Sequence, residues 1–371
     1  DFLVCARGAG SRFRLYLMDV DGNRELLYEG VHNVLQAMPI RPRQAPPVLV
    51  DRVAWPGTGE ARKPPQDGEL YSPDVYEGTA LPRGSVRSLR IVQQDAKTYS
   101  TWAKTYRNSG PAVSIVQEEA VKRFLGTVPV EADGSVRFHL PAGRAVFFQL
   151  LDERGRCIQT MRSFSGVMPG ESRGCVGCHE MHSTTPPRSR GLAFARGPRA
   201  IEPPPWGDQS ISYERFVQPV LDRYCGSCHQ GEGKARAKLD LTLRPGHGPF
   251  KEPYVTLVGP AGWGSPAKPG PGYGLAGAIP VEQMGMNNPV SIGTIAPLTY
   301  LSGKSKLIDI ASNPKYKMDA ESLQRLIAWV DACCPYFGEE EIRALGDPDF
   351  PGIEKLPIRP RVATAPKIQR P

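Results

Sequence analysis

The stretch GCVGCHEMHS at residues 174–183 places two cysteines, separated by two residues, directly before a histidine. The stretch YCGSCHQGEG at residues 224–233 repeats this arrangement. A Cys-x-x-Cys pair is typical of zinc knuckles, of redox-active disulfides and of covalent haem attachment. Only the last of these three gives a role to the histidine that follows the second cysteine.

The zinc and disulfide interpretations fit the surroundings of the two motifs less well. The two knuckles of a zinc ribbon are usually separated by about 15–20 residues. Here a longer, proline-rich segment (184–206) lies between Cys178 and Cys225. A thioredoxin-type disulfide lies at the start of a helix in a βαβ unit, and the sequence pattern shows no such unit. Zinc or a disulfide therefore stays the alternative to haem.

Haem c attachment accounts for all three residues of each motif, because the thiols bond to the porphyrin vinyl groups and the histidine binds the iron. The sequence therefore predicts two haem c groups. Their covalent attachment residues are Cys175, Cys178, Cys225 and Cys228, and their iron ligands are His179 and His229. Haem c is attached outside the cytoplasm, so we expect a periplasmic or otherwise extracytoplasmic location and an oxidising compartment.

Two helical patterns accompany the second motif. Apolar residues recur at helical spacing in ISYERFVQPVLDRYCGSCH (211–229), and again in KMDAESLQRLIAWVDACCPY (317–336), where Asp319 is the expected N-cap. Small cytochrome c domains show this pattern, and their second iron ligand comes from the loop before the last helix. Met318 lies at that place, so we expect it to bind the second iron; the alternative is a hydrophobic contact at the helix start. The other candidates are Met284, Met286 and His247.

Strand patterns dominate the rest of the chain. Residues 1–30 read as a three-stranded meander, like part of a propeller blade. Residues 70–162 contain two strand–turn–strand patterns, with an Asp-Gly turn at 133–134 and a Glu-Arg-Gly turn at 153–155, as in a small antiparallel sandwich. With 39 glycines and 38 prolines, many loops are expected.

The predicted fold class is multidomain α+β, with an antiparallel β-sandwich-like middle domain carrying one haem c and a mainly helical, loop-rich cytochrome c domain carrying the other. The predicted domains are the end of a β-propeller-like domain (1–37), a linker (38–69), a β domain with the first haem (70–200), a cytochrome c-like domain with the second haem (201–340) and a proline-rich C-terminal tail (341–371).

Charge and hydropathy limit the classes of partner. The net charge of +8 is scattered, without a Lys/Arg block and interleaved aromatics, so we expect no nucleic-acid partner. No run of 18 apolar residues is present, so we expect no transmembrane segment. The chain begins at Asp1 without an apolar leader, so we expect that a signal peptide has been removed from it or that the chain is a fragment. The expected partners are a redox partner protein and further subunits.

The middle of the chain resembles a known family. VPVEADGSVRFHLPAGRAVFFQLLDERGRCIQTMRSFSGVMPGESRGCVGCHE (128–180) is similar to the middle domain of the hydrazine synthase alpha subunit family. DRYCGSCH (222–229) and LIAWVDACCPY (326–336) resemble the C-terminal cytochrome domain of the same family, and the opening meander resembles the end of its propeller.

This resemblance implies a reactive haem in the middle domain and an electron-transferring haem in the C-terminal domain. In the family's enzyme, a tyrosine four residues after the motif histidine binds the iron, and the histidine faces a zinc ion. Ser183 occupies that position here, which argues against a true hydrazine synthase and for ordinary ligation by His179. A zinc ion near the first haem stays an alternative. Two functions remain open: a dihaem electron-transfer protein, or a redox enzyme acting on a small nitrogen compound at the first haem.

Overall fold

A computed structural model describes residues 2–7, 12–40, 42, 44–95, 113–116, 120–178, 191–261, 270–280 and 295–344. The chain divides into two compact units, Asp1–Asp51 and Arg52–Pro371. The boundary between the units lies inside the segment expected as a linker. Among the described residues, no helix has the length and apolar character needed to cross a membrane.

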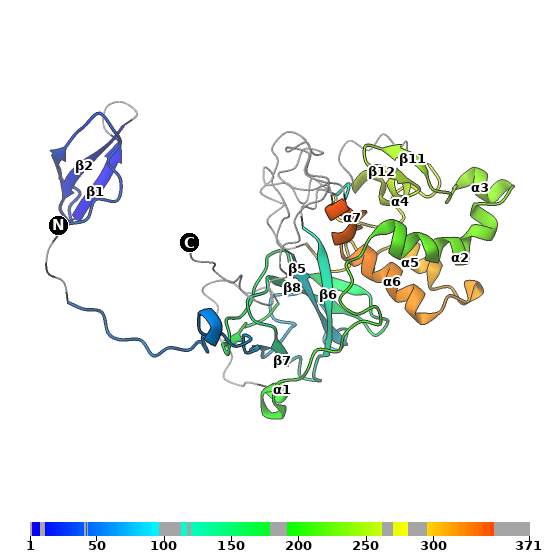
Figure 1. Ribbon diagram of the computed structural model, residues 1–371, viewed down its shortest axis with the longest axis horizontal. Coiled ribbons are helices and arrows are strands. Elements are labelled where there is room, and N and C mark those ends of the chain that lie inside the picture. The colour runs from blue at the N-terminus through cyan, green and yellow to red at the C-terminus, as the bar shows by residue number, and fades with distance from the viewer. Residues whose placement is uncertain are drawn as a thin grey trace. The chain divides into compact units, whose positions relative to one another are not determined.

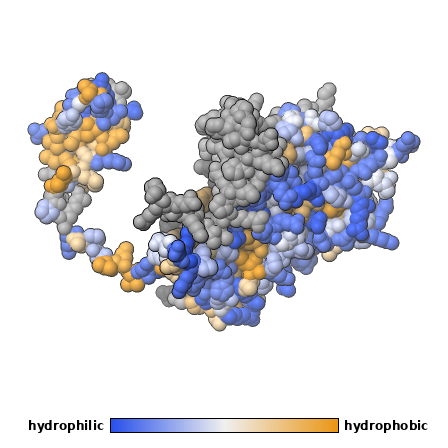
Figure 2. Space-filling model, viewed as in Figure 1, coloured by the Kyte–Doolittle hydropathy of each residue, from blue (hydrophilic) through white to orange (hydrophobic). Residues whose placement is uncertain are grey.

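The first unit contains the expected meander. Its strands β1 (Phe2–Arg7), β2 (Phe13–Met18) and β3 (Arg24–Tyr28) form one antiparallel sheet in the order β1-β2-β3. The Asp19 carboxylate closes the turn between β2 and β3 by accepting hydrogen bonds from the backbone of Asp21 and Asn23. Hydrophobic side chains are exposed on this unit (Figure 2), among them Phe2, Leu26, Leu27 and Tyr28. Its origin as part of a propeller stays a prediction.

The second unit begins with two facing sheets. One has the order β10-β4-β7 and consists of β4 (Gly68–Ser72), β7 (Val136–Leu140) and β10 (Ser172–Gly174). The other has the order β6-β5-β8-β9 and consists of β5 (Ser88–Gln94), β6 (Lys122–Pro129), β8 (Val146–Leu151) and β9 (Cys157–Thr160). Apolar side chains of both sheets form one core, in which the Phe138 and Phe148 rings meet edge to face at 6.0 Å. This arrangement agrees with a sandwich, except that β10 pairs with β4 in parallel.

The expected hairpin at 133–134 forms its turn but not its strand pair. Glu131 N–H donates to the Ser135 carbonyl at 2.9 Å, yet β6 and β7 belong to different sheets. The reason is that the free edge of β6 is occupied, because Thr127 and Glu202 exchange both backbone hydrogen bonds at 2.9 Å. The second expected hairpin, β8 to β9 through 153–155, is confirmed.

Helices make the third layer of the second unit. The segment entering the second motif is helical as expected, with a π-helical turn (Tyr213–Val217) leading into α2 (Gln218–His229). The last predicted helix is α6 (Ala320–Asp331), and the Asp319 carboxylate caps it by accepting from Ser322 N–H. The remaining helices are α1 (Gly191–Arg196), α3 (Lys234–Lys238), α4 (Tyr254–Val258), α5 (Lys306–Ala311) and α7 (Glu339–Ala344), with a short hairpin of β11 (Arg244–His247) and β12 (Phe250–Glu252).

The central sheet is buried on both faces (Figure 1). All six residues of β8 are buried, because Phe148 and Leu150 face the other sheet while Phe147 and Leu151 pack against the helical layer. A strand covered on both faces reads as a continuous apolar run rather than an alternating one. Within the described residues of 52–344, the central sheet therefore shares one apolar core with the other sheet and a second apolar core with the helical layer.

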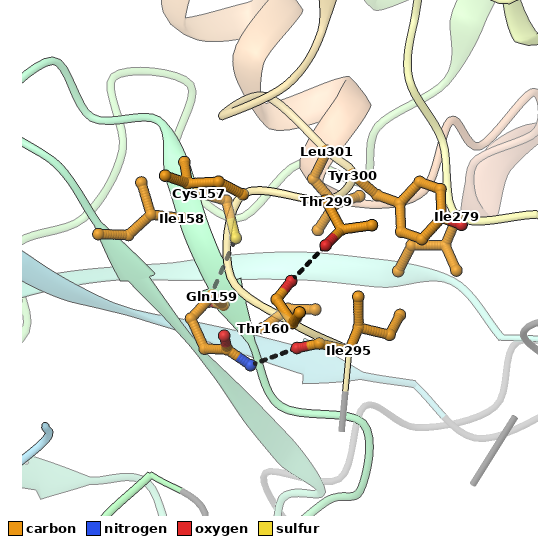
Figure 3. Close-up of a pocket in the computed structure, with 11 residues that line it drawn as sticks. Cys157, Ile158, Gln159, Thr160, Ile279, Ile295, Thr299, Tyr300 and Leu301 are labelled. Atoms are coloured by element: carbon orange, nitrogen blue, oxygen red, sulfur yellow. Dashed lines mark hydrogen bonds between the residues drawn. The ribbon is translucent and has the colours of Figure 1, made fainter. Parts of the chain in front are cut away.

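Backbone pairing joins β9 to the segment before α5. Leu298 N–H donates to the Ile158 carbonyl at 3.0 Å, and Gly303 N–H donates to the Cys157 carbonyl at 3.1 Å. The Gln159 side chain donates to the Ile295 carbonyl at 3.1 Å (Figure 3). The β layer and the helical layer are thus linked by main-chain hydrogen bonds as well as by apolar packing.

Gly126 lets the segment between the two motifs lie against β6. Its φ is +138°, and a Cβ there would overlap the Glu202 carbonyl. We expect Gly126→Ala to lower the free energy of unfolding by about 1–3 kcal/mol more than Gly143→Ala, because overpacking adds to the cost of positive φ. Gly143 also has positive φ (+71°), but no atom lies within 4 Å of the place that a Cβ would take there. Equal losses in urea unfolding would show that the close approach is unimportant.

Candidate functional site

The first motif follows an edge strand of the first sheet. Gly174, the last residue of β10, pairs with Tyr71 of β4, and Cys175 N–H donates to the Tyr71 carbonyl at 2.8 Å. Cys175 and Cys178 are both half-buried and pack against the core between the sheets. A side chain at Gly177 would collide with the backbone of Glu77, so the glycine between the cysteines is required by the local packing.

The chain that follows the first motif is anchored to the same sheet. His179, His182 and Ser183 lie outside the described residues, and the description resumes at α1. Two backbone N–H groups at the start of α1 donate to the turn between β6 and β7, from Leu192 to Asp133 at 2.7 Å and from Ala193 to Ser135 at 2.9 Å. The described residues on either side of 179–190 are therefore held on one β framework.

The second motif lies in the last turn of α2. Cys225 and Cys228 are three residues apart and so share one face of the helix. Cys225 is half-buried and Cys228 is exposed. Burial, followed by the nearby Cys228, raises the pKa of the Cys225 thiol. The helix thus presents both thiols together at the edge of the core, which suits covalent attachment of a flat apolar group.

His229 is oriented by a backbone carbonyl. Its Nδ1 lies 2.9 Å from the carbonyl oxygen of Leu239. A carbonyl oxygen can only accept, so Nδ1 carries the proton and Nε2 keeps its lone pair. Metal-binding histidines usually donate their second nitrogen in this way, which fixes the ring and its tautomer. Leu241 N–H also donates to the His229 carbonyl at 3.1 Å. The residues around the second motif therefore fit an iron ligand at His229.

Met318 directly precedes Asp319, a residue that is hydrogen-bonded to the helix of the second motif. Its side chain is half-buried and packs against the core of the helical layer. The next residue, Asp319, accepts a hydrogen bond of 2.5 Å from the hydroxyl of Tyr224, the residue before Cys225. This hydrogen bond, followed by those from Ser322, lowers the pKa of Asp319 to about 2. The structure therefore joins the residue after Met318 to α2, and the ligand role of Met318 stays a prediction.

The sequence pattern predicted the packing of the Tyr224 ring but not the hydrogen bond of its hydroxyl. Its spacing places it on the apolar face of the helix, and its ring does pack against the core. The role of its hydroxyl gave no sequence signal, because Asp319 is 95 residues away. Among the alternative ligands, His247 is half-buried in β11, while Met284 and Met286 lie outside the described residues.

The zinc alternative is not decided by the residues that the structure describes. Among these residues, no three His, Cys, Asp or Glu side chains come together as a metal site, but His179 and His182 are not among them. None of the cysteines in the described ranges forms a disulfide. The buried cysteines are Cys157, Cys333 and Cys334. Zinc near the first motif stays a prediction.

Comparisons with known proteins agree with the sequence resemblance. The family profile of the hydrazine synthase alpha subunit middle domain matches residues 84–180. Hydrazine synthase from Kuenenia stuttgartiensis is similar in structure, with a TM-score of 0.59 at 15% sequence identity. The similarity covers 91% of this chain and 54% of that chain, so the present chain spans about half the length of that protein. No curated protein matches in sequence. Residues 84–180 therefore match the middle domain of the hydrazine synthase alpha subunit, and the fold of the chain is similar to that of hydrazine synthase.

Proposed function

We propose that this protein is a dihaem c-type cytochrome that transfers electrons. The observation that carries the proposal is the pair of Cys-x-x-Cys-His motifs together with the His229–Leu239 hydrogen bond at 2.9 Å. That hydrogen bond leaves Nε2 of the motif histidine ready to bind a metal. When bound, each haem would supply one-electron redox chemistry.

Different residues would attach the haems to the chain and bind their irons. Each cysteine pair would attach one haem covalently, and His179 and His229 would bind the irons. Met318 would bind the second iron on its other face. The exposed Cys228 places one edge of the second site at the surface, where a redox partner protein can approach. Covalent haem attachment also supports an extracytoplasmic location, and further subunits are part of the proposal.

The shared core supports electron transfer between the two sites. The Cys175–Cys178 side of the framework and α2 belong to the same compact unit. The central sheet contacts the first-motif sheet on one face and the helical layer on the other. Packing of both motif regions in one compact unit supports the proposal that electrons pass between the two haems.

A second function is favoured by one specific observation. The matched middle domain (84–180) ends at the first motif, so the first haem could act on a small nitrogen compound, as the family name suggests. Ser183 replaces the tyrosine of the family's enzyme, which weighs against this function. This second function requires an open position on the first iron, whereas electron transfer does not.

Haem content tests the proposal directly. In a host with a haem c maturation system, the mass of the denatured protein should exceed the chain mass by two haems. We expect Cys175→Ser with Cys178→Ser to remove one haem, and Cys225→Ser with Cys228→Ser to remove the other. Cys5→Ser is the matched control and should keep both. An unmodified mass from a host that matures other c-type cytochromes would reject the proposal.

A further inference from the structure

We infer that the hydroxyl of Tyr224 is a positioning group that holds Met318 at the second iron. The inference rests on the proposed function, in which Met318 binds that iron. It is carried by a juxtaposition: Tyr224 directly precedes Cys225, Asp319 directly follows Met318, and the two side chains are hydrogen-bonded at 2.5 Å. The bond therefore connects the attachment helix to the ligand segment.

The contact between the two residues is reciprocal. The Tyr224 hydroxyl donates to Oδ2 of Asp319, and Asp319 N–H donates back to the same hydroxyl at 3.3 Å. The Arg223 guanidinium lies 3.4 Å from the same carboxylate oxygen and over the Tyr224 ring at 5.1 Å. Both contacts of the Asp319 carboxylate with α2 are exposed; the Arg223 pair contributes little, and the Tyr224 hydrogen bond is the shorter of the two.

Asp319 fixes the backbone on one side of Met318. Its Oδ1 accepts from Ser322 N–H at 2.8 Å and its Oδ2 accepts from the Ser322 hydroxyl at 2.9 Å, so the carboxylate also caps α6. On the other side, Lys317 has positive φ (+48°) and follows a helical turn at Pro314–Tyr316. The Met318 segment is thus short and held at both ends.

A thioether binds iron through one neutral, weakly basic sulfur, so the stability of that bond depends on how well the protein presents the sulfur. Holding the segment beforehand lowers the entropy that ligation must overcome. Without the Tyr224 hydroxyl, the carboxylate of Asp319 would still cap α6, but of its two described contacts with α2 only the exposed Arg223 pair would remain. Met318 would then leave the iron more often, and an external ligand could replace it.

The parent protein for the test is the full chain with Cys175→Ser and Cys178→Ser, which keeps only the second haem. Three variants of this parent are compared. For Tyr224→Phe we expect carbon monoxide to bind the reduced second iron about tenfold more readily, as the loss of one charge-assisted hydrogen bond predicts. The charge-transfer band of thioether-ligated ferric haem should weaken in parallel. Glu321→Ala removes an exposed ion pair with Arg325 on α6 and should match the parent in both measurements. Met318→Ala gives the fully open reference.

A fourth variant changes the same hydrogen bond from the other partner, so that a folding defect of Tyr224→Phe cannot by itself explain the result. Asp319→Ser keeps a good N-cap residue for α6 and the 3.3 Å backbone N–H bond to Tyr224 but removes the carboxylate that accepts from Tyr224, so it should shift both measurements in the same direction as Tyr224→Phe. If both variants retain the parent's band and carbon monoxide binding while Met318→Ala opens the iron, the inference is wrong and the proposed function stands. If Met318→Ala changes neither measurement, Met318 is not the ligand, and Tyr224 then has no positioning role. A chain that carries no haem would reject the proposed function itself.

Discussion

Replacing Asp331 by alanine is expected to lower the free energy of unfolding by about 3–5 kcal/mol, the usual cost of removing one partner from a buried ion pair. Asp331 is the last residue of α6, and its side chain is fully buried. One carboxylate oxygen lies 2.6 Å from the guanidinium of Arg90 on β5. The pair therefore connects the helical layer to the central sheet.

The loss is large because several groups depend on this carboxylate. Ser302 donates its N–H and its hydroxyl to Asp331, both at 2.9 Å. The Gln149 side chain donates to the Asp331 backbone carbonyl at 2.8 Å, a bond that alanine at this position keeps. Burial raises the pKa of Asp331 while Arg90 opposes that change. Without the carboxylate, the Arg90 charge would stay about nine-tenths buried with only neutral acceptors, Gln149 and the Gly155 carbonyl.

Urea unfolding of the whole chain measures the effect. The matched control is Glu321→Ala, which removes an exposed pair with Arg325 on the same helix and should cost at most about 0.5 kcal/mol. Replacing the pair by apolar residues, Arg90→Met with Asp331→Leu, should recover only the part of the loss that comes from the unpaired Arg90 charge, because the buried Ser302 donors still lose their acceptor. If Asp331→Ala costs no more than Glu321→Ala, apolar packing alone holds the two layers together.

Local features of the fold could be predicted from sequence because they depend on residues close together in the chain. The spacing of apolar residues predicted α2 and α6, and Asp319 was identified as the cap from its place before α6. The turn at 153–155 predicted the β8–β9 hairpin. In each case the residues that decide the structure lie within a few positions of one another.

Features that depend on distant partners gave no such signal. Nothing near β6 indicates that Glu202 occupies its edge and so separates β6 from β7. Arg90 and Asp331 are 241 residues apart, and neither residue type predicts burial by itself. The same holds for the site: the motif predicts His229 as a ligand, but the carbonyl that orients it belongs to Leu239, and any residue would supply that carbonyl.

The second large effect concerns carbon monoxide. In the dihaem protein we expect carbon monoxide to bind the first reduced iron and not the second, and we expect Met318→Ala to open the second iron completely. Difference spectra of the reduced protein, with and without carbon monoxide, measure this. The expected change at the second iron is from no binding to stoichiometric binding.

The two irons should differ because their surroundings do. Met318 packs against the core beside the segment tied to α2, so its sulfur can be held in place. The nearest methionine before the first motif, Met168, is exposed in a turn closed by the Glu171 N–H bond to its carbonyl at 3.0 Å. His182 is only three residues past His179, which is too close for the opposite face of the same ring. Among the described residues, Met161 packs against the core that Cys175 and Cys178 also contact, but we expect no methionine of these residues to close the first iron as Met318 closes the second.

Met161 provides the matched control, because it is also half-buried and packs against the same core but lies in no segment attached to the second motif. Met161→Ala should leave the second iron closed to carbon monoxide, whereas Met318→Ala should open it. A second iron that stays closed in Met318→Ala would transfer the ligand role to Met284, Met286 or His247. Wild-type protein that shows no carbon monoxide binding would mean that both irons are fully ligated. Electron transfer would then be the function, since an iron without an open position cannot bind a small nitrogen compound.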